Sequence, residues 1–207
     1  MASLFIGLAA IVDFLDGMVA RLFKSTSDMG RELDSLADLV SFGVAPGMII
    51  YQFLRLGFMQ EKTGLDFSII WLLPALLIPC AAAYRLARFN LDPGQAYGFK
   101  GIPTPAVGLL FASLPLIYWT TEFTGIASIL LSKWGLYILI LFVSYGMVSH
   151  WPLLSFKFHD FSIRKNLPRY LIIIVAVIAF AILKWLAIPL VFILYIVLSL
   201  AFKNSNS

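Results

Sequence analysis

Residues 13–38 read DFLDGMVARLFKSTSDMGRELDSLAD, and apolar stretches long enough to enter a bilayer lie on both sides of this segment. The segment contains six of the chain's eleven acidic residues. Carboxylates within membrane segments cost free energy, and for that reason they usually serve a function. The stretch therefore predicts two membrane helices that carry a functional site where they face each other.

The rest of the chain is equally apolar. Of its 207 residues 61% are hydrophobic and 13% charged, and the mean hydropathy is +0.93, which excludes a water-soluble domain. Apolar stretches between polar breaks predict seven crossings, at residues 3–23, 33–56, 68–89, 106–120, 133–149, 170–184 and 187–202. We expect one all-α domain over 1–207, a polytopic transmembrane helical bundle. Its catalytic helices would lie within 3–110, and its last two crossings would form a hairpin around residues 186–189.

The basic residues predict an orientation. If the segment after the first crossing is cytoplasmic, alternation places 11 of the 15 Lys and Arg residues on that side. This predicts an integral membrane protein with its acidic site facing the cytoplasm. An odd number of crossings with an outer N-terminus suggests a further helix ahead of residue 1, which would make eight. The net charge of +4 without a basic run argues against a nucleic acid partner.

The spacing of four aspartates predicts that they meet. Asp13 and Asp16 are three residues apart, Asp34 and Asp38 are four apart, and each pair shares one helical face. A short connection makes the two helices antiparallel neighbours. Four converging carboxylates repel one another unless cations neutralise them, and hard oxygen ligands suit Mg²⁺ or Mn²⁺, here two ions. Two alternatives are a structural ion-pair network with nearby arginines and the ion route of a cation transporter or channel.

Two glycines and an arginine fit a phosphate ligand at this site. Gly17, beside Asp16, lets a flat ligand approach closely. Gly30 is expected to open the second helix with its free amides. Arg21, one turn beyond Gly17, can meet phosphate oxygens with a bidentate contact.

Written as a pattern, residues 13–38 are D-x2-D-G-x2-A-R-x8-G-x3-D-x3-D. At every fixed position this resembles the signature of the CDP-alcohol phosphotransferases. The resemblance implies metal ligation by Asp13, Asp16 and Asp34, with Asp38 beside the metals as the general base. It also implies that the CDP moiety is lined by Gly17, Ala20, Arg21 and Gly30.

Three further stretches, 33–46, 84–90 and 99–106, resemble the members of this family that use serine as the acceptor. The resemblance implies transfer of the phosphatidyl group of CDP-diacylglycerol to L-serine, giving phosphatidylserine and CMP, by a homodimer. Arg85, Arg88 and Lys100 are candidates for binding the serine carboxylate, although each also fits a headgroup anchor. Glycerol 3-phosphate and inositol phosphate are alternative acceptors, but their phosphate favours a denser cationic pocket.

Overall fold

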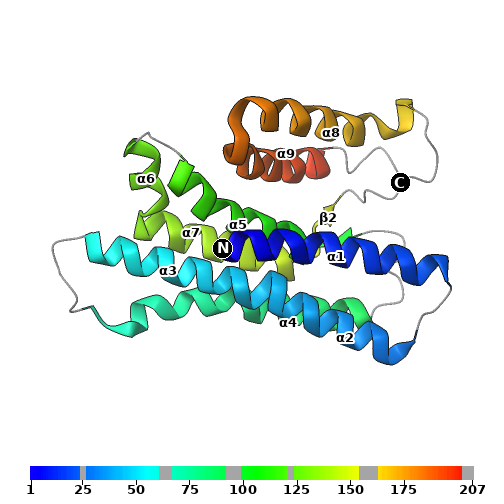
Figure 1. The fold of residues 1–207 in the computed structure, drawn as a ribbon, viewed down its shortest axis with the longest axis horizontal. Helices are drawn as coiled ribbons and strands as arrows, with labels where there is room; N and C mark the ends of the chain where they lie inside the picture. Colours follow the sequence, from blue (N-terminus) through cyan, green and yellow to red (C-terminus); the bar gives the residue numbers. More distant parts are fainter. Residues whose placement is uncertain (24–26, 61–66, 92–98, 121–123, 154–162, 202–207) are drawn as a thin grey trace.

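The structure, a computed structural model, describes residues 1–23, 27–60, 67–91, 99–120, 124–153 and 163–201. Helices dominate these ranges (Figure 1). The α-helices are α1 (Ala2–Leu22), α2 (Asp28–Leu39), α3 (Ala45–Gln60), α4 (Leu77–Leu91), α5 (Thr104–Thr120), α6 (Thr124–Leu130), α7 (Lys133–Val148), α8 (Ile163–Leu183) and α9 (Ala187–Ala201). The other elements are a π-helical turn (Val40–Val44), two 3₁₀ helices (Ile69–Leu76 and Lys184–Leu186) and the strands β1 (Phe99–Lys100) and β2 (Pro152–Leu153).

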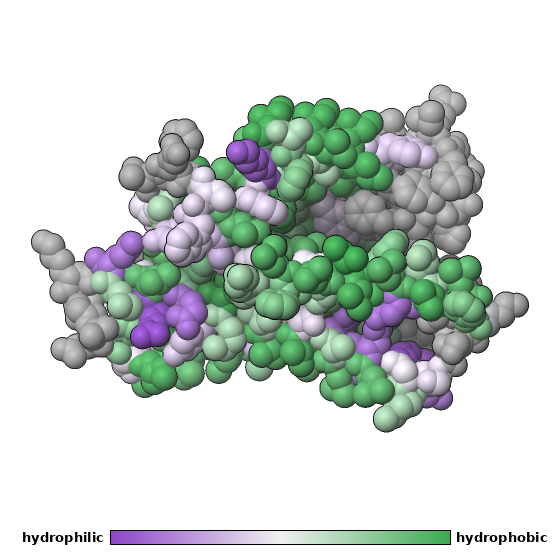
Figure 2. Space-filling view, in the orientation of Figure 1, coloured by the Kyte–Doolittle hydropathy of each residue, from purple (hydrophilic) through white to green (hydrophobic). Residues whose placement is uncertain are grey.

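The predicted all-α membrane bundle is confirmed, and each of the seven predicted crossing segments is helical. Within the described ranges, four helical stretches are long and apolar enough to cross a membrane: Ala2–Val19, Asp28–Gln60, Ile69–Leu91 and Tyr170–Ala201. Helices α5 and α7 are apolar but shorter. In Figure 2 hydrophobic side chains cover most of α1, α8 and α9, as expected of surfaces that face lipid.

Helices α2 and α3 form one continuous rod with a wider turn in the middle. The N–H of Ala45 donates to the carbonyl of Val40, five residues back, which is the hydrogen bond of a π turn. This turn begins two residues after Asp38. It therefore changes the face that the rod presents just beyond the acidic residues, and such turns occur frequently at functional sites.

The start of α2 is capped by a side chain, so one expectation about Gly30 was wrong. The hydroxyl of Ser27 accepts a hydrogen bond from the Gly30 N–H at 3.0 Å. Asp28 lies in the first turn, where its charge favours the helix dipole, and it pairs with Arg31 at 3.3 Å. The amide of Gly30 is thus already occupied and is not free for a ligand.

Small residues bring the rod into close contact with its neighbours. A Cβ atom on Gly43 would lie 2.9 Å from the Cβ of Ala82 on α4, and one on Gly108 of α5 would lie 2.7 Å from Cδ1 of Phe42. Phe42 is almost completely buried. These two approaches fix the helix that carries Asp34 and Asp38 against α4 and α5.

A short antiparallel pair of strands closes one end of the bundle. Residue Phe99 pairs with Leu153 and Lys100 with Pro152. Next to it, the N–H of Gly101 donates to the carbonyl of Trp151 at 2.9 Å, and the N–H of Ile102 to that of Gly146 at 3.0 Å. The chain between α4 and α5 is therefore tied to the C-terminal end of α7.

Replacing Gly101 with alanine is expected to destabilise the protein by more than about 2 kcal/mol. The residue has a φ of +81°, and a Cβ there would lie 2.6 Å from the carbonyl oxygen of Met147 and 2.9 Å from that of Ser149. The measurement is the melting temperature in detergent. The control is Gly125→Ala, since a Cβ atom on Gly125 would meet nothing within 4 Å. Equal melting temperatures of the two variants would contradict this account.

The last two helices form the predicted hairpin, with the turn slightly earlier than expected. Helix α8 ends at Leu183, and the 3₁₀ turn Lys184–Leu186 reverses the chain into α9. Lys184 adopts a positive φ of 51° at this reversal. Helix α9 packs against both α8 and α5, so the hairpin lies beside α5 (Figure 1).

Candidate metal and substrate site

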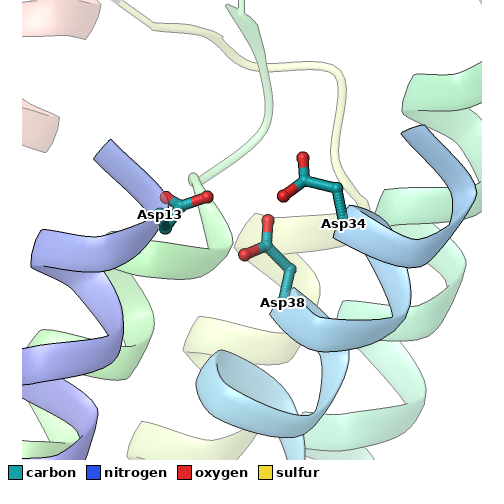
Figure 3. Close-up of side chains that lie close together, drawn as sticks. All are labelled: Asp13, Asp34 and Asp38. Atoms are coloured by element: carbon teal, nitrogen blue, oxygen red, sulfur yellow. The ribbon is translucent and has the colours of Figure 1, made fainter. Parts of the chain in front are cut away.

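The carboxylates of Asp13, Asp34 and Asp38 converge between α1 and α2. One oxygen atom from each lies within 4.8 Å of the others, and the three side chains point toward a common centre (Figure 3). Asp13 and Asp38 are half-buried, whereas Asp34 is exposed. Two helices, α1 and α2, therefore supply three acidic groups to one point.

The arrangement fits a hard divalent cation. Oxygens on opposite sides of one Mg²⁺ are about 4 Å apart, because each bond is about 2 Å long. The observed separations need only small side-chain adjustments to reach that geometry. Without a cation, three carboxylates at this distance repel one another strongly in a partly apolar setting.

Asp16, the fourth predicted ligand, does not join the converging three. It is exposed on α1, yet its charge is close enough to interact with those of the other three aspartates. Gly17 follows it, and a Cβ there would meet nothing within 4 Å, so the space beside this residue is open. Ala20 and Arg21 belong to α1, but their side chains lie outside the described part of the chain.

Arg85 of α4 is buried, with 5% of its surface exposed. Its charge interacts with that of Asp38. One guanidinium nitrogen donates to the hydroxyl of Thr104 at 3.4 Å, while Nε has no hydrogen-bond partner among the described residues. Arg85, one of the predicted acceptor-binding residues, is thus close enough to the acidic group for its charge to interact with that of Asp38.

Arg88 points to a different part of the bundle. Its two terminal nitrogens donate to the carbonyls of Val148 at 2.7 Å and Ser149 at 3.0 Å, at the end of α7. A guanidinium in this position satisfies unpaired carbonyls and favours the helix dipole. Arg88 therefore joins α4 to α7. Lys100 has its backbone in β1, and its side chain lies outside the described part of the chain.

A polar contact that the sequence did not predict joins α4 to the acidic helix. The amide nitrogen of Asn90 donates to Ser35 at 3.0 Å and to Glu32 at 3.4 Å, and the Ser35 hydroxyl is also 3.3 Å from the Asn90 carbonyl oxygen. Ser35 directly follows Asp34. One side of α2 thus binds α4 while the adjacent side presents Asp34 and Asp38 to α1. Asn90 ends the stretch 84–90 that resembles the family, but that resemblance gave no indication of its partner on α2.

Replacing Asn90 with alanine is expected to weaken the binding of Mg²⁺ by the three carboxylates about 3- to 10-fold. The loss of two hydrogen bonds costs about 1 kcal/mol each and frees α2 to move away from Asp13. The measurement is a calorimetric titration of the purified protein with Mg²⁺. Gln52→Ala, at an exposed position on α3, is the control; an unchanged affinity for Mg²⁺ in Asn90→Ala would show that the contact does not position the carboxylates.

Residues 1–150 match the family described as CDP-alcohol phosphatidyltransferase. Several similar proteins carry the name CDP-diacylglycerol–serine O-phosphatidyltransferase. The protein of Bacillus subtilis is 39% identical over 123 residues, covering 56% of this chain and 61% of the relative. The protein of Mycobacterium leprae is 37% identical over 188 residues, covering 84% of this chain and 54% of the relative. The protein of Saccharomyces cerevisiae is 40% identical over 136 residues, covering 55% of this chain and 45% of the relative. The chain thus spans about half the length of these relatives.

Proposed function

Because the chain belongs to the CDP-alcohol phosphatidyltransferase family, we propose that it transfers the phosphatidyl group of CDP-diacylglycerol to the hydroxyl of L-serine, giving phosphatidylserine and CMP. The observation that carries this proposal is the convergence of Asp13, Asp34 and Asp38 from two helices. The relatives named for this reaction support serine as the acceptor.

We propose that the metal is Mg²⁺ or Mn²⁺, bound as two ions. Four carboxylates would hold it, those of Asp13, Asp16, Asp34 and Asp38. The three converging oxygens provide the donor set, and Asp16 adds a further carboxylate nearby. When bound, the cations would neutralise the diphosphate and the charge that develops during transfer. Their identity is part of the proposal.

Asp38 is proposed as the general base. Its carboxylate accepts the proton of the serine hydroxyl, whose oxygen forms a bond to the phosphorus nearer the diacylglycerol. The bond from that phosphorus to the CMP oxygen breaks, and CMP leaves. Asp38 is half-buried, interacts electrostatically with Arg85 and lies within hydrogen-bonding reach of Asp13, so its carboxylate is held at the edge of the acidic group.

The CDP moiety is proposed to lie along Gly17, Ala20, Arg21 and Gly30. The open space beside Gly17 supports close approach of a ligand to α1. Since the amide of Gly30 is bonded to Ser27, this glycine would contribute its small size to the site. The lipid tails of the substrate would remain in the bilayer, at the cytoplasmic face of a bacterial inner membrane, and we expect a homodimer.

Arg85 is the strongest candidate for the serine carboxylate, with Arg88 and Lys100 as further predicted contacts. The two terminal nitrogens of Arg88 are already bonded to residues at the end of α7, whereas the charge of Arg85 interacts with that of Asp38. A single buried guanidinium matches one carboxylate. Glycerol 3-phosphate and inositol phosphate would bring a phosphate of higher charge, which one cation neutralises less completely.

The test is CMP release by purified protein supplied with CDP-diacylglycerol and Mg²⁺ or Mn²⁺. We expect release to depend on L-serine and to be at least about 100-fold slower with glycerol 3-phosphate or inositol phosphate, because a site built for one charged group rejects another strongly. Release that requires either phosphate would assign a different acceptor. No release with any acceptor would overturn the proposal.

A further inference from the structure

Two contacts fix the register of α4 against the rod that α2 and α3 form. At one of them, a Cβ atom on Gly43 would lie 2.9 Å from the Cβ of Ala82. At the other, the side-chain amide of Asn90 donates to Ser35 at 3.0 Å. The two contacts are eight residues apart on both helices and follow in opposite order, so α4 runs antiparallel to the rod. Residues that lie between the two contacts therefore face each other at matched levels.

Asp38, Arg85 and Thr104 lie at one level of the bundle. Asp38 and Arg85 both fall between the two contacts, within about 3 Å of each other along the helix axes, because each residue advances a helix by about 1.5 Å. Helix α5 meets the rod where Gly108 touches Phe42, and Thr104 and Asp38 each lie four residues before that contact. The bond from Arg85 to Thr104, at 3.4 Å, joins α4 and α5 at this same level.

The guanidinium of Arg85 has one hydrogen-bond partner among the described residues, Thr104. Nη1 donates to the hydroxyl, whereas the buried Nε has no partner there. The exposed fraction is 5% for Arg85 and 1% for Thr104. Because the guanidinium is planar and rigid, a bond at one nitrogen restricts the direction of the whole group. A buried cation with unmet donors is costly, and a carboxylate that binds it at two points removes much of that cost.

The hydroxyl of Thr104 is directed away from its own helix. Threonine hydroxyls within helices commonly bond to a carbonyl of the preceding turn, as Thr120 at the other end of α5 does to Leu116 at 2.7 Å. Thr104 instead accepts a bond from α4. The residues just before it are tied to the end of α7 through the N–H groups of Gly101 and Ile102. A fixed segment therefore presents this hydroxyl to Arg85.

We infer that Thr104 is a positioning residue of the acceptor subsite: its hydroxyl orients the buried guanidinium of Arg85, whose Nε edge then binds the carboxylate of an amino-acid acceptor at the level of Asp38. The inference rests on the proposed function and adds to it a residue of α5 that was not among the predicted site residues. A carboxylate bound at two points is fixed in direction, which aims the acceptor hydroxyl at Asp38.

The experiment measures KM for L-serine, KM for CDP-diacylglycerol and kcat in the full chain. The variant is Thr104→Val, which keeps the branched shape and removes the hydroxyl. We expect the serine KM to rise about tenfold, as for the loss of a hydrogen bond to a charged group, while the lipid KM stays within about twofold. The matched control is Thr120→Val on the same helix, which should leave all three constants within about twofold.

Thr104→Ser tests whether the hydroxyl itself is required. Serine restores the acceptor for Arg85, so we expect the serine KM to stay within about threefold of the wild-type value. A purely structural role at the start of α5 would instead raise both KM values together or lower kcat alone. If Thr104→Val does not fold, Thr104→Ala removes the same hydroxyl and decides by the same criterion.

A double-mutant cycle with Arg85→Lys shows whether Thr104 acts through the guanidinium. In the lysine background, Thr104→Val is expected to change the serine KM by less than about threefold, because residues in one contact are not additive. An unchanged serine KM in Thr104→Val, an equal rise in both KM values, or a full tenfold rise in the lysine background would overturn the inference while leaving the proposed function intact. Wild-type protein without serine-dependent CMP release would overturn the proposed function, and the inference with it.

Discussion

Replacement of Asp38 with asparagine is expected to lower kcat for serine-dependent CMP release by about 10³-fold or more. Asparagine is nearly the same size but cannot accept the proton of the serine hydroxyl. The half-buried position of Asp38, beside Asp13 and Asp34, leaves no described carboxylate better placed to take over this step without leaving the converging group. The measurement is CMP release under saturating lipid and serine.

The matched control for this variant is Asp28→Asn on the same helix. Asp28 is exposed and pairs with Arg31, three residues away, so its loss is expected to change kcat by less than about twofold. Binding of CDP-diacylglycerol separates the two proposed roles of Asp38. Retained binding with lost turnover supports a base, whereas a raised metal requirement supports a ligand. Asp38→Asn protein that keeps a tenth of the wild-type rate would remove Asp38 from the mechanism.

The helices could be predicted because the bilayer leaves few alternatives. A segment of membrane length must satisfy its own backbone hydrogen bonds, so apolar stretches between polar breaks become helices. The spacing of Asp34 and Asp38 likewise placed both on one face of α2, which the structure confirms. The helices and the shared face of Asp34 and Asp38 both follow from residues that are close together in the sequence.

The remaining features depend on contacts between distant segments. The bond from Asn90 to Ser35 joins residues 55 positions apart, and those from Arg88 to Val148 and Ser149 join residues 60 and 61 apart. A basic or amide residue at a helix end reads equally well as a cap, a headgroup anchor or a substrate contact. Only the packing of α4 between α2 and α7 distinguishes these readings.

The prediction of four converging aspartates was close but incomplete for a similar reason. Two residues three apart in a helix are separated by a rotation of about 300° around the helix axis. Asp13 and Asp16 are therefore near each other, but their side chains do not face the same point. The π turn after Asp38 and the close approach of Gly108 to Phe42 set how the acidic helix meets its neighbours. Neither feature follows from hydrophobic periodicity. The part of the site that depends on helix orientation therefore required the structure.

Removal of divalent metal is expected to abolish activity, with a fall of about 100-fold or more after chelation. The three carboxylates would then be unneutralised and would repel the diphosphate of the substrate. Addition of Mg²⁺ or Mn²⁺ in excess over the chelator should restore the rate, and monovalent salt at equal ionic strength should not. The readout is CMP release as a function of free metal.

The same titration tests which carboxylates bind the metal. Asp13→Asn and Asp34→Asn are each expected to raise the half-saturating metal concentration about 10- to 100-fold, since each removes a charged oxygen from the converging group. Asp16→Asn should have a smaller effect if this residue contributes mainly through its charge, and Asp28→Asn should have none. Asp13 and Asp34 lie on different helices, so equal shifts in both variants would locate the ion between α1 and α2. Full activity in chelator, or metal requirements unchanged in both variants, would instead leave the convergence of these aspartates without a catalytic role.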